Sequence, residues 1–140
     1  MSRASRCSVR PRSETSPALS TLWRESKAEV THTDDEESLR RLLAHDRAAL
    51  LVAEVDRRLV GSIIAAWDGW RGSVYRLTVA PEHRRHGLGR RLLHEAERRL
   101  TRLGATRLQA IVVETEVVAT GFWRASDWEE QVERLRFVRG

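Results

Sequence analysis

Apolar residues form short runs, or alternate with polar ones, through the middle of the chain. The runs ALLVAEV (49–55) and LVGSIIAAW (59–67) have the length of core strands. The polar residues 56–58 between them predict a hairpin, although this turn lacks an Asn-Gly or Asp-Gly pair. The segment SVYRLTVA (73–80) predicts a third strand. Regular alternation would place Tyr75, Leu77 and Val79 on one side of this strand and Val74, Arg76 and Thr78 on the other.

A helical period replaces the alternation after residue 87. Apolar residues three and four positions apart predict one buried helix face, made of Leu88, Leu92, Leu93, Ala96, Leu100 and Leu103, before Gly104 ends the helix. One earlier helix is expected to begin at Ser16-Pro17, with the serine as its cap. Another follows the acidic run 34–37, which suits the positive end of a helix dipole. A last helix is predicted over about 116–126.

Three further segments complete the expected sheet. SVRPR (8–12) predicts an edge strand, since Pro11 is tolerated only at an edge. TRLQAIVVE (106–114) predicts a fourth central strand, and residues 128–138 alternate as a C-terminal strand or hairpin. Only the unit 73–114 is long enough to join parallel strands. The predicted fold class is α/β, a mixed, mostly antiparallel central sheet with a parallel β-α-β unit at 73–114 and helices on both faces.

The length of 140 residues indicates one domain, with residues 1–15 as a flexible Arg/Ser-rich N-terminus and residues 16–140 as the folded part. The N-terminal arginines precede no hydrophobic region, so no signal peptide is expected, and no apolar run reaches the roughly 18 residues of a membrane span. The single cysteine, Cys7, cannot form an internal disulfide and favours a reducing, cytoplasmic location. No cluster of potential metal ligands is evident, so no metal is expected.

The net charge of +5 is compatible with phosphate-bearing partners, including nucleic acids and nucleotide cofactors. Glu95 lies at helical pairing distance from Arg98 and Arg99, which predicts a solvent-exposed face of ion pairs rather than a nucleic-acid surface. The tryptophans stand at turns and helices instead of alternating along a strand, which also argues against nucleic acid.

Two glycines, Gly87 and Gly89, stand where the third strand gives way to the long helix. The first amides of a helix have no intrahelical partners and carry the positive end of the dipole, so they bind anions. Glycines let a phosphate approach these amides, and the arginine pairs 84–85 and 90–91 surround them with cations. Neither the P-loop pattern nor the three-glycine Rossmann pattern is present.

The segment YRLTVAPEHRRHGLGRRLL resembles the signature of the GNAT superfamily of acetyl-CoA-dependent N-acetyltransferases, Q/R-x-x-G-x-G/A after the fourth strand. ATGFWRASDW (119–128) is similar to the later A-x-x-F-Y element of that family. The resemblance implies that acetyl-CoA is the acyl donor, that a strand edge pairs with its pantetheine arm while a backbone amide polarises the thioester carbonyl, and that the following loop cradles its pyrophosphate. The residues thereby implied in cofactor binding are Leu77, Thr78, Val79, Arg84, Arg85, His86, Gly87, Leu88, Gly89, Arg90 and Trp123.

The catalytic groups are not identified by this resemblance. Trp123 stands where the family often has a proton-donating tyrosine, and Ser73 where some members have a catalytic glutamate. Asp68 and Glu114, at predicted strand ends, are weak candidates for a base, although such carboxylates more often form turns or face solvent. Tyr75, the only tyrosine, is a third weak candidate, with a position in the core favoured over one in the cleft.

The leading hypothesis is acetyl transfer from acetyl-CoA to a primary amine of an unidentified small molecule or protein. A domain that binds acyl-CoA without turnover is one alternative, because the family's acid and base are missing, and a basic nucleic-acid-binding module is a weaker one. The acceptor is not identified by the sequence, since the family builds that pocket from its variable segments. Dimers are common in the family, so a homodimer is compatible with the resemblance.

Overall fold

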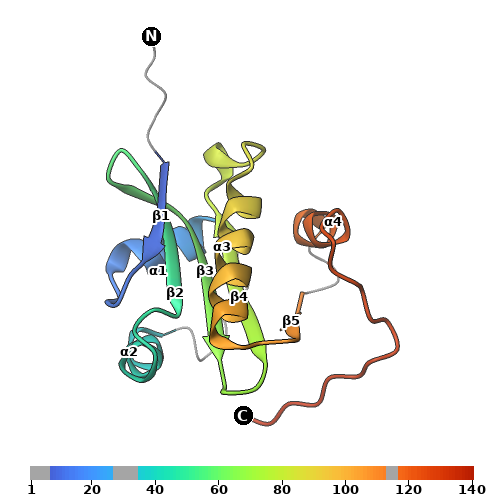
Figure 1. Cartoon of the computed structure of the whole chain (residues 1–140). Coiled ribbons are helices and arrows are strands. Elements are labelled where there is room, and N and C mark those ends of the chain that lie inside the picture. The colour runs from blue at the N-terminus through green and yellow to red at the C-terminus, as the bar shows by residue number, and fades with distance from the viewer. Residues whose placement is uncertain (1–6, 27–34, 113–116) are drawn as a thin grey trace. The chain divides into compact units, whose positions relative to one another are not determined.

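Five strands form one sheet in the order β1-β2-β3-β4-β5 in a computed structural model that describes residues 7–26, 35–112 and 117–140 (Figure 1). The strands are β1 (Cys7–Pro11), β2 (Leu50–Val55), β3 (Arg58–Trp67), β4 (Gly72–Val79) and β5 (Leu108–Ala110). The first four pair antiparallel, and β4 pairs parallel with β5. This is the predicted mixed sheet, with Pro11 on an edge strand as expected.

Helices cover both faces of this sheet. The helices of the sheet's own part of the chain are α1 (Pro17–Glu25), α2 (Glu36–His45) and α3 (Leu88–Leu103), with the 3-10 turn η2 (Pro81–His83) before α3, and α4 (Val117–Arg124) follows later in the chain. A Cβ on Gly61 would lie 2.9 Å from Leu92 of α3, whereas the next residue, Ser62, contacts Trp23 of α1. Successive strand residues point to opposite faces, so α1 and α3 lie on opposite sides of β3.

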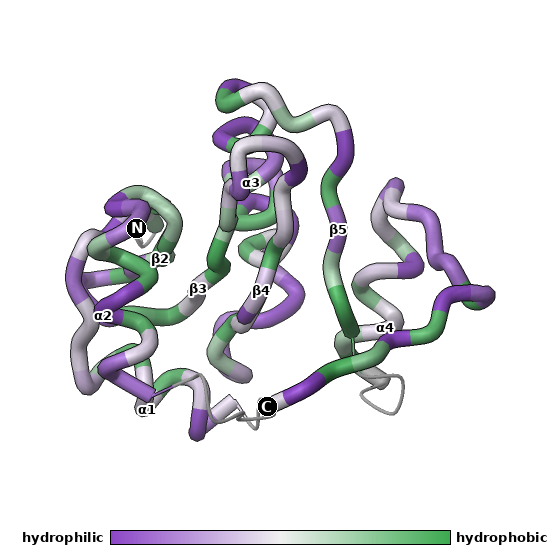
Figure 2. The backbone as a smooth tube through the Cα atoms, turned by 90° about the horizontal axis from the view of Figure 1, so that it is seen from below, coloured by the Kyte–Doolittle hydropathy of each residue, from purple (hydrophilic) through white to green (hydrophobic). Residues whose placement is uncertain are grey.

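The core lies between these helices and the central strands. Its largest fully buried side chains include Trp23, Leu50, Ile63, Leu92 and Leu100. Hydrophobic colouring runs along β2 and β3 in Figure 2, while α3 alternates between hydrophobic and hydrophilic positions. The predicted face of α3 is buried from Leu88 to Leu100, but Leu103 is 44% exposed because it lies in the last turn of the helix.

The first turns of α1 and α2 are capped in different ways. Asp35 caps α2 as a side-chain acceptor, 2.7 Å from the amide of Ser38. Ser16 is the N-cap residue of α1 as predicted, although its hydroxyl makes no capping hydrogen bond. The amide of Leu19 donates to the carbonyl of Ser16 instead, at 3.1 Å.

Three predictions of local structure need correction. β5 is shorter than the expected strand 106–114, whose last two residues lie outside the described part of the chain. Residues 128–138 form no strand, because no described residue pairs with them, and the apolar side chains after Trp128 (Val132, Leu135, Phe137 and Val138) stay exposed. Arg98 pairs with Glu95 on the surface as predicted, but Arg99 is buried, where it donates to the carboxylate of Asp46 and the carbonyl of Ala65.

The chain forms two compact units, Met1–Ala110 and Ile111–Gly140. The sheet and helices α1 to α3 belong to the first unit, and α4 belongs to the second.

Candidate functional site

The turn between β4 and α3 contains the predicted anion site. Gly87 is the N-cap residue of α3, with a φ of 78°, and it brings no capping side chain to the first helical amides. Among the described residues no atom lies within 4 Å of the position that a Cβ on Gly87 would occupy. The start of α3 is therefore uncapped and open, as an anion site requires.

The loop also carries positive charge at its surface. Arg85, His86 and Arg90 are exposed, and Arg85 adopts a φ of 67°, which is unusual for a residue with a side chain. Leu88 is only 8% exposed and anchors the loop to the core, while Gly89 follows it in the first turn of α3. Exposed cations thus flank the uncapped helix start.

Arg84 has a different environment from the other loop arginines. Its Nε donates to the carbonyl of Val79 at 3.1 Å, and its Nη2 donates to the carbonyl of Ser26 at 3.4 Å. These bonds connect the loop to the end of β4 and to the residue that follows α1. Arg84 thereby holds the loop in place from within the first unit.

Next to this loop, β4 extends beyond its described ladder with β5. The ladder with β5 covers only Gly72 to Val74, so the described residues provide no β5 partner for Tyr75 to Val79. Of the three residues implied in cofactor binding on this stretch, Thr78 is buried, and Leu77 and Val79 are half-buried. A strand edge that extends beyond its neighbouring strand can accept another extended chain.

A β-bulge interrupts β4 within the same stretch. Ser62 of β3 pairs with Thr78 and Ile64 pairs with Tyr75, so two residues of β4 lie opposite Ile63 alone. Arg76, one of these two, adopts a φ of 55°. The predicted strict alternation along β4 is therefore wrong at this point, because the extra residue shifts its phase.

Sequence reasoning missed the contacts that hold this bulge. The indole Nε1 of Trp23 donates to Ser62 Oγ at 2.9 Å, and Ser62 Oγ donates to the carbonyl of Arg76 at 2.9 Å. The Arg76 guanidinium lies over the Trp23 ring, with Cζ 5.0 Å from the ring centroid. The available signal was Ser62, a lone polar residue inside the apolar run GSIIAAW.

The Asp68 side chain stabilises the turn between β3 and β4. Its Oδ1 accepts hydrogen bonds from the amides of Trp70 and Arg71, at 2.8 and 2.6 Å. The bonds from the backbone of Arg71 and then Trp70 hold the pKa of this carboxyl below its usual value, which makes it a weaker proton acceptor. Trp70 beside it is 68% exposed and stacks under the Arg71 guanidinium, at 4.1 Å from its ring centroid.

Tyr75 and Glu114 are the other two residues that the sequence offered as candidate catalytic groups. Tyr75 is 51% exposed, so the expectation that it lies in the core was wrong. Its neighbour Val74 points into the core, and alternation turns Tyr75 outward just beyond the last β4–β5 pair. Glu114 lies outside the described residues. Ser73 accepts a hydrogen bond from Gln109 of β5 at 3.1 Å.

Trp123 belongs to the second unit, within α4. Its ring contacts Phe122, with centroids 5.6 Å apart, and Trp128, with centroids 4.9 Å apart, both edge to face. All three side chains are half-buried in this aromatic cluster. The cluster packs α4 against the residues that follow it.

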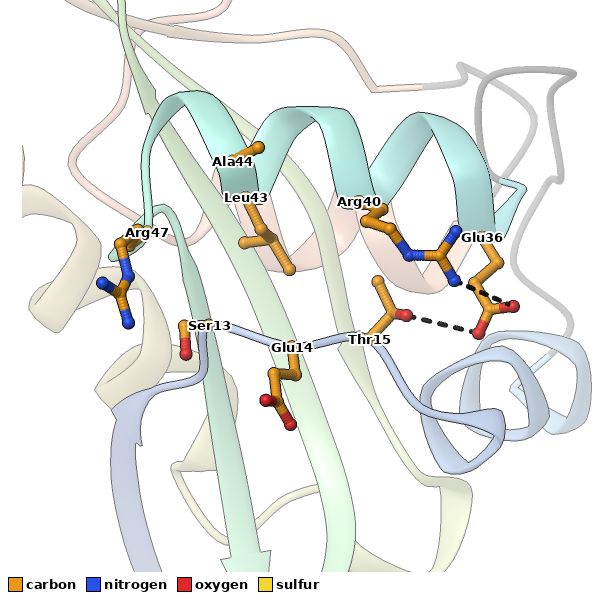
Figure 3. A pocket seen from close by; sticks show the side chains of 8 residues that line it. All are labelled: Ser13, Glu14, Thr15, Glu36, Arg40, Leu43, Ala44 and Arg47. Atoms are coloured by element: carbon orange, nitrogen blue, oxygen red, sulfur yellow. Dashed lines mark hydrogen bonds and ion pairs between the residues drawn. The ribbon is translucent and has the colours of Figure 1, made fainter.

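A hollow of about 500 Å³ lies beside α2 (Figure 3). Glu36 faces Arg40 at one end of it, at 3.6 Å, and Thr15 donates to Glu36 at 3.4 Å. Glu14 and Arg47 also line it, so its walls carry both signs of charge. None of the residues implied in cofactor binding lines this hollow.

The described part of the chain lacks two further features. No described helix is both long and apolar enough to cross a membrane. Within 7–26, 35–112 and 117–140, no three His, Cys, Asp or Glu side chains gather where they could hold a metal ion.

Comparison with known proteins points to one family. The Acetyltransferase (GNAT) family profile matches residues 16–127. An acetyltransferase of Yersinia pestis is 34% identical over 110 residues, which cover 79% of this chain and 78% of the relative. The fold is similar to that of the aminoglycoside N-acetyltransferase AAC(6')-Iy solved with CoA (TM-score 0.71, 18% identity, 100% and 98% of the two chains). It is also similar to the PaiA N-acetyltransferase of Thermoplasma acidophilum solved with coenzyme A (TM-score 0.73, 20% identity, 85% and 87%).

Proposed function

Because the chain belongs to the GNAT family of acetyltransferases, we propose that it transfers an acetyl group from acetyl-CoA to a primary amine of a small molecule or protein. The observation that carries the choice of donor is the continuity between the part of β4 that extends beyond the described β5 ladder and an uncapped helix start. Beyond Val74 the edge of β4 lacks a β5 partner, and the chain then leads through η2 to Gly87 and the first turn of α3. An elongated ligand with amides and a pyrophosphate has groups for both features.

Each part of the site has one role in this proposal. The edge of Leu77, Thr78 and Val79 pairs with the pantetheine amides of the donor as a neighbouring strand would. The amides of residues 87–89 and the exposed cations Arg85 and Arg90 bind the pyrophosphate oxygens. Acetyl-CoA supplies an activated acetyl group as a thioester. A backbone amide at the bulge stabilises the negative charge that develops on its carbonyl oxygen.

Proton transfer does not depend on Trp123 in this proposal. An indole N–H is a hydrogen-bond donor only and is too weak an acid to protonate a thiolate at neutral pH. Trp123 acts through packing beside the sulfur end of the donor, as the matched position in the family sequence element suggests. The bonded, low-pKa carboxylate of Asp68 is a poor base, so the amine enters in its neutral form and loses its proton to water.

The first amine acceptors to test follow from a protein of the same fold. AAC(6')-Iy acts on aminoglycosides, and this chain has the same fold, which motivates polyamino compounds as the first acceptors to try. Trp70 and Tyr75, both exposed near the β3–β4 turn and the open edge of β4, are candidates to contact the acceptor.

Calorimetry with acetyl-CoA and CoA tests the binding step, followed by transfer assays with a panel of amines. Saturation at about 100 times Kd should raise the free energy of unfolding by about 2.7 kcal/mol. No binding at millimolar acetyl-CoA would reject the proposal. Binding without transfer to any amine would leave a domain that binds acyl-CoA without turnover.

A further inference from the structure

We propose that Ser62, with Trp23 behind it, is a positioning residue for acetyl transfer. Ser62 holds the Arg76 carbonyl out of the β3–β4 ladder and so fixes the direction of the backbone amide that polarises the thioester carbonyl. This role rests on the proposed function, because it concerns the same strand edge.

The direction of the hydrogen-bond chain follows from its chemistry. An indole N–H can only donate, and a backbone carbonyl can only accept. Ser62 Oγ therefore accepts from Trp23 and directs its single proton to the carbonyl of Arg76, with both bonds 2.9 Å long. Trp23 thus orients the hydroxyl, and the hydroxyl orients the carbonyl.

Burial makes this chain costly to break. Ser62 is 0% exposed and Trp23 is 2% exposed, so water cannot replace the bond between them, and the bond from Ser62 to the half-buried Arg76 is partly shielded from water. Removing the Ser62 hydroxyl would take one hydrogen-bond partner from the buried indole N–H of Trp23 and one from the carbonyl of Arg76. Both groups would then tend to reorient. If packing were the only need at this position, an apolar residue would serve in the otherwise apolar run of β3.

The same contacts stabilise an unfavourable backbone conformation. Arg76 has a φ of 55°, a region that residues with a side chain rarely adopt. Its guanidinium lies over the Trp23 ring, 5.0 Å from the centroid, so α1 contacts both the side chain and, through Ser62, the carbonyl. The peptide between Arg76 and Leu77 is thereby turned within the part of β4 that lacks a β5 partner. Bulges re-aim backbone and side chains in this way next to active sites.

The infrared band of the thioester carbonyl reports on this role directly. The probe is acetyl-CoA labelled with ¹³C at its carbonyl and bound to the wild type, to Ser62→Ala and to Trp23→Phe. We expect the wild type to shift the band to lower frequency than in free acetyl-CoA, and Ser62→Ala to lose at least half of that shift. Trp23→Phe, which keeps a ring but leaves the hydroxyl unoriented, should lose a smaller part. The affinity for CoA, which has no thioester carbonyl, should stay within about threefold, and kcat should fall about tenfold or more in Ser62→Ala.

A matched control separates positioning from general destabilisation. Leu39→Ala removes a buried side chain from α2 and should lower the melting temperature without moving the band. A band unchanged in Ser62→Ala, or moved as far by Leu39→Ala, would overturn the role of Ser62 while leaving the proposed function intact. If Ser62→Ala does not fold, an unchanged band in Trp23→Phe overturns it and a partial loss supports it. Absence of acetyl-CoA binding by the wild type would reject the proposed function and this role together.

Discussion

Replacing Gly87 with alanine tests the anion site at the start of α3. Gly87 has a φ of 78°, and a left-handed conformation costs a residue with a Cβ about 1–2 kcal/mol. For a chain of this length that cost corresponds to a melting temperature lower by roughly 3–7 °C. No described atom lies within 4 Å of the added Cβ, so it creates no clash inside the protein. Any further effect must come from the ligand.

The Cβ would project into the space that we assign to the pyrophosphate. Displacing one hydrogen bond to a charged group costs about 1.5–3 kcal/mol, so the Kd for acetyl-CoA should rise about 10- to 100-fold. Calorimetry measures this Kd, and circular dichroism confirms that the helix content is retained.

Gly104→Ala is the matched control at the other end of α3. Gly104 is the C-cap with a φ of 113°, and a Cβ there would lie 3.8 Å from Trp67, which is ordinary contact. We expect a similar loss of stability with an unchanged Kd for acetyl-CoA. Equal Kd values for Gly87→Ala, Gly104→Ala and the wild type would refute the assignment of the anion site to this loop.

Three further substitutions test individual side chains. Trp123→Phe should lower the melting temperature modestly, because it weakens the contact with Trp128, and it should raise KM while kcat stays within about tenfold of the wild type. A thousandfold loss of kcat with intact acetyl-CoA affinity would show that the indole has a chemical role. Asp68→Asn keeps an acceptor for the turn amides and should keep kcat, whereas a large loss of kcat would reinstate Asp68 as a base. Because folding lowers the pKa of Asp68, the wild type should lose stability from this group as the pH falls through that pKa, and the variant should not. An acid titration of stability measures this difference. Arg84→Ala removes the bonds to Val79 and Ser26 and should raise the KM for acetyl-CoA, and an unchanged KM would mean that these bonds do not hold the loop.

Local patterns were sufficient to predict most of the first unit. The apolar runs correspond to β2, β3 and β4, the helical period corresponds to α3, and the motif around Gly87 led to the family that the comparisons show. These features depend on residues close together in the sequence.

The errors arose where distant residues decide the structure. The bulge at Arg76 depends on Ser62 across the ladder and on Trp23 from α1, and no local pattern distinguishes it from regular alternation. Arg99 fits a surface ion-pair pattern, yet it is buried and pairs with Asp46, which lies 53 positions away in the sequence. Residues 128–138 have a strand pattern, but a strand also needs a partner, which sequence alternation cannot supply.

Acetyl transfer itself is the most direct measurement of the proposed function. The wild-type protein is incubated with ¹³C-labelled acetyl-CoA and separate polyamines, aminoglycosides, amino acids and peptide N-termini, while CoA release and the mass of each amine are followed. We predict that at least one amine gains a single labelled acetyl group in step with CoA release, and that Gly87→Ala needs more acetyl-CoA for the same rate. Tight acetyl-CoA binding with no labelled amine, and CoA release no faster than without protein, would contradict the assignment of this chain as a working N-acetyltransferase.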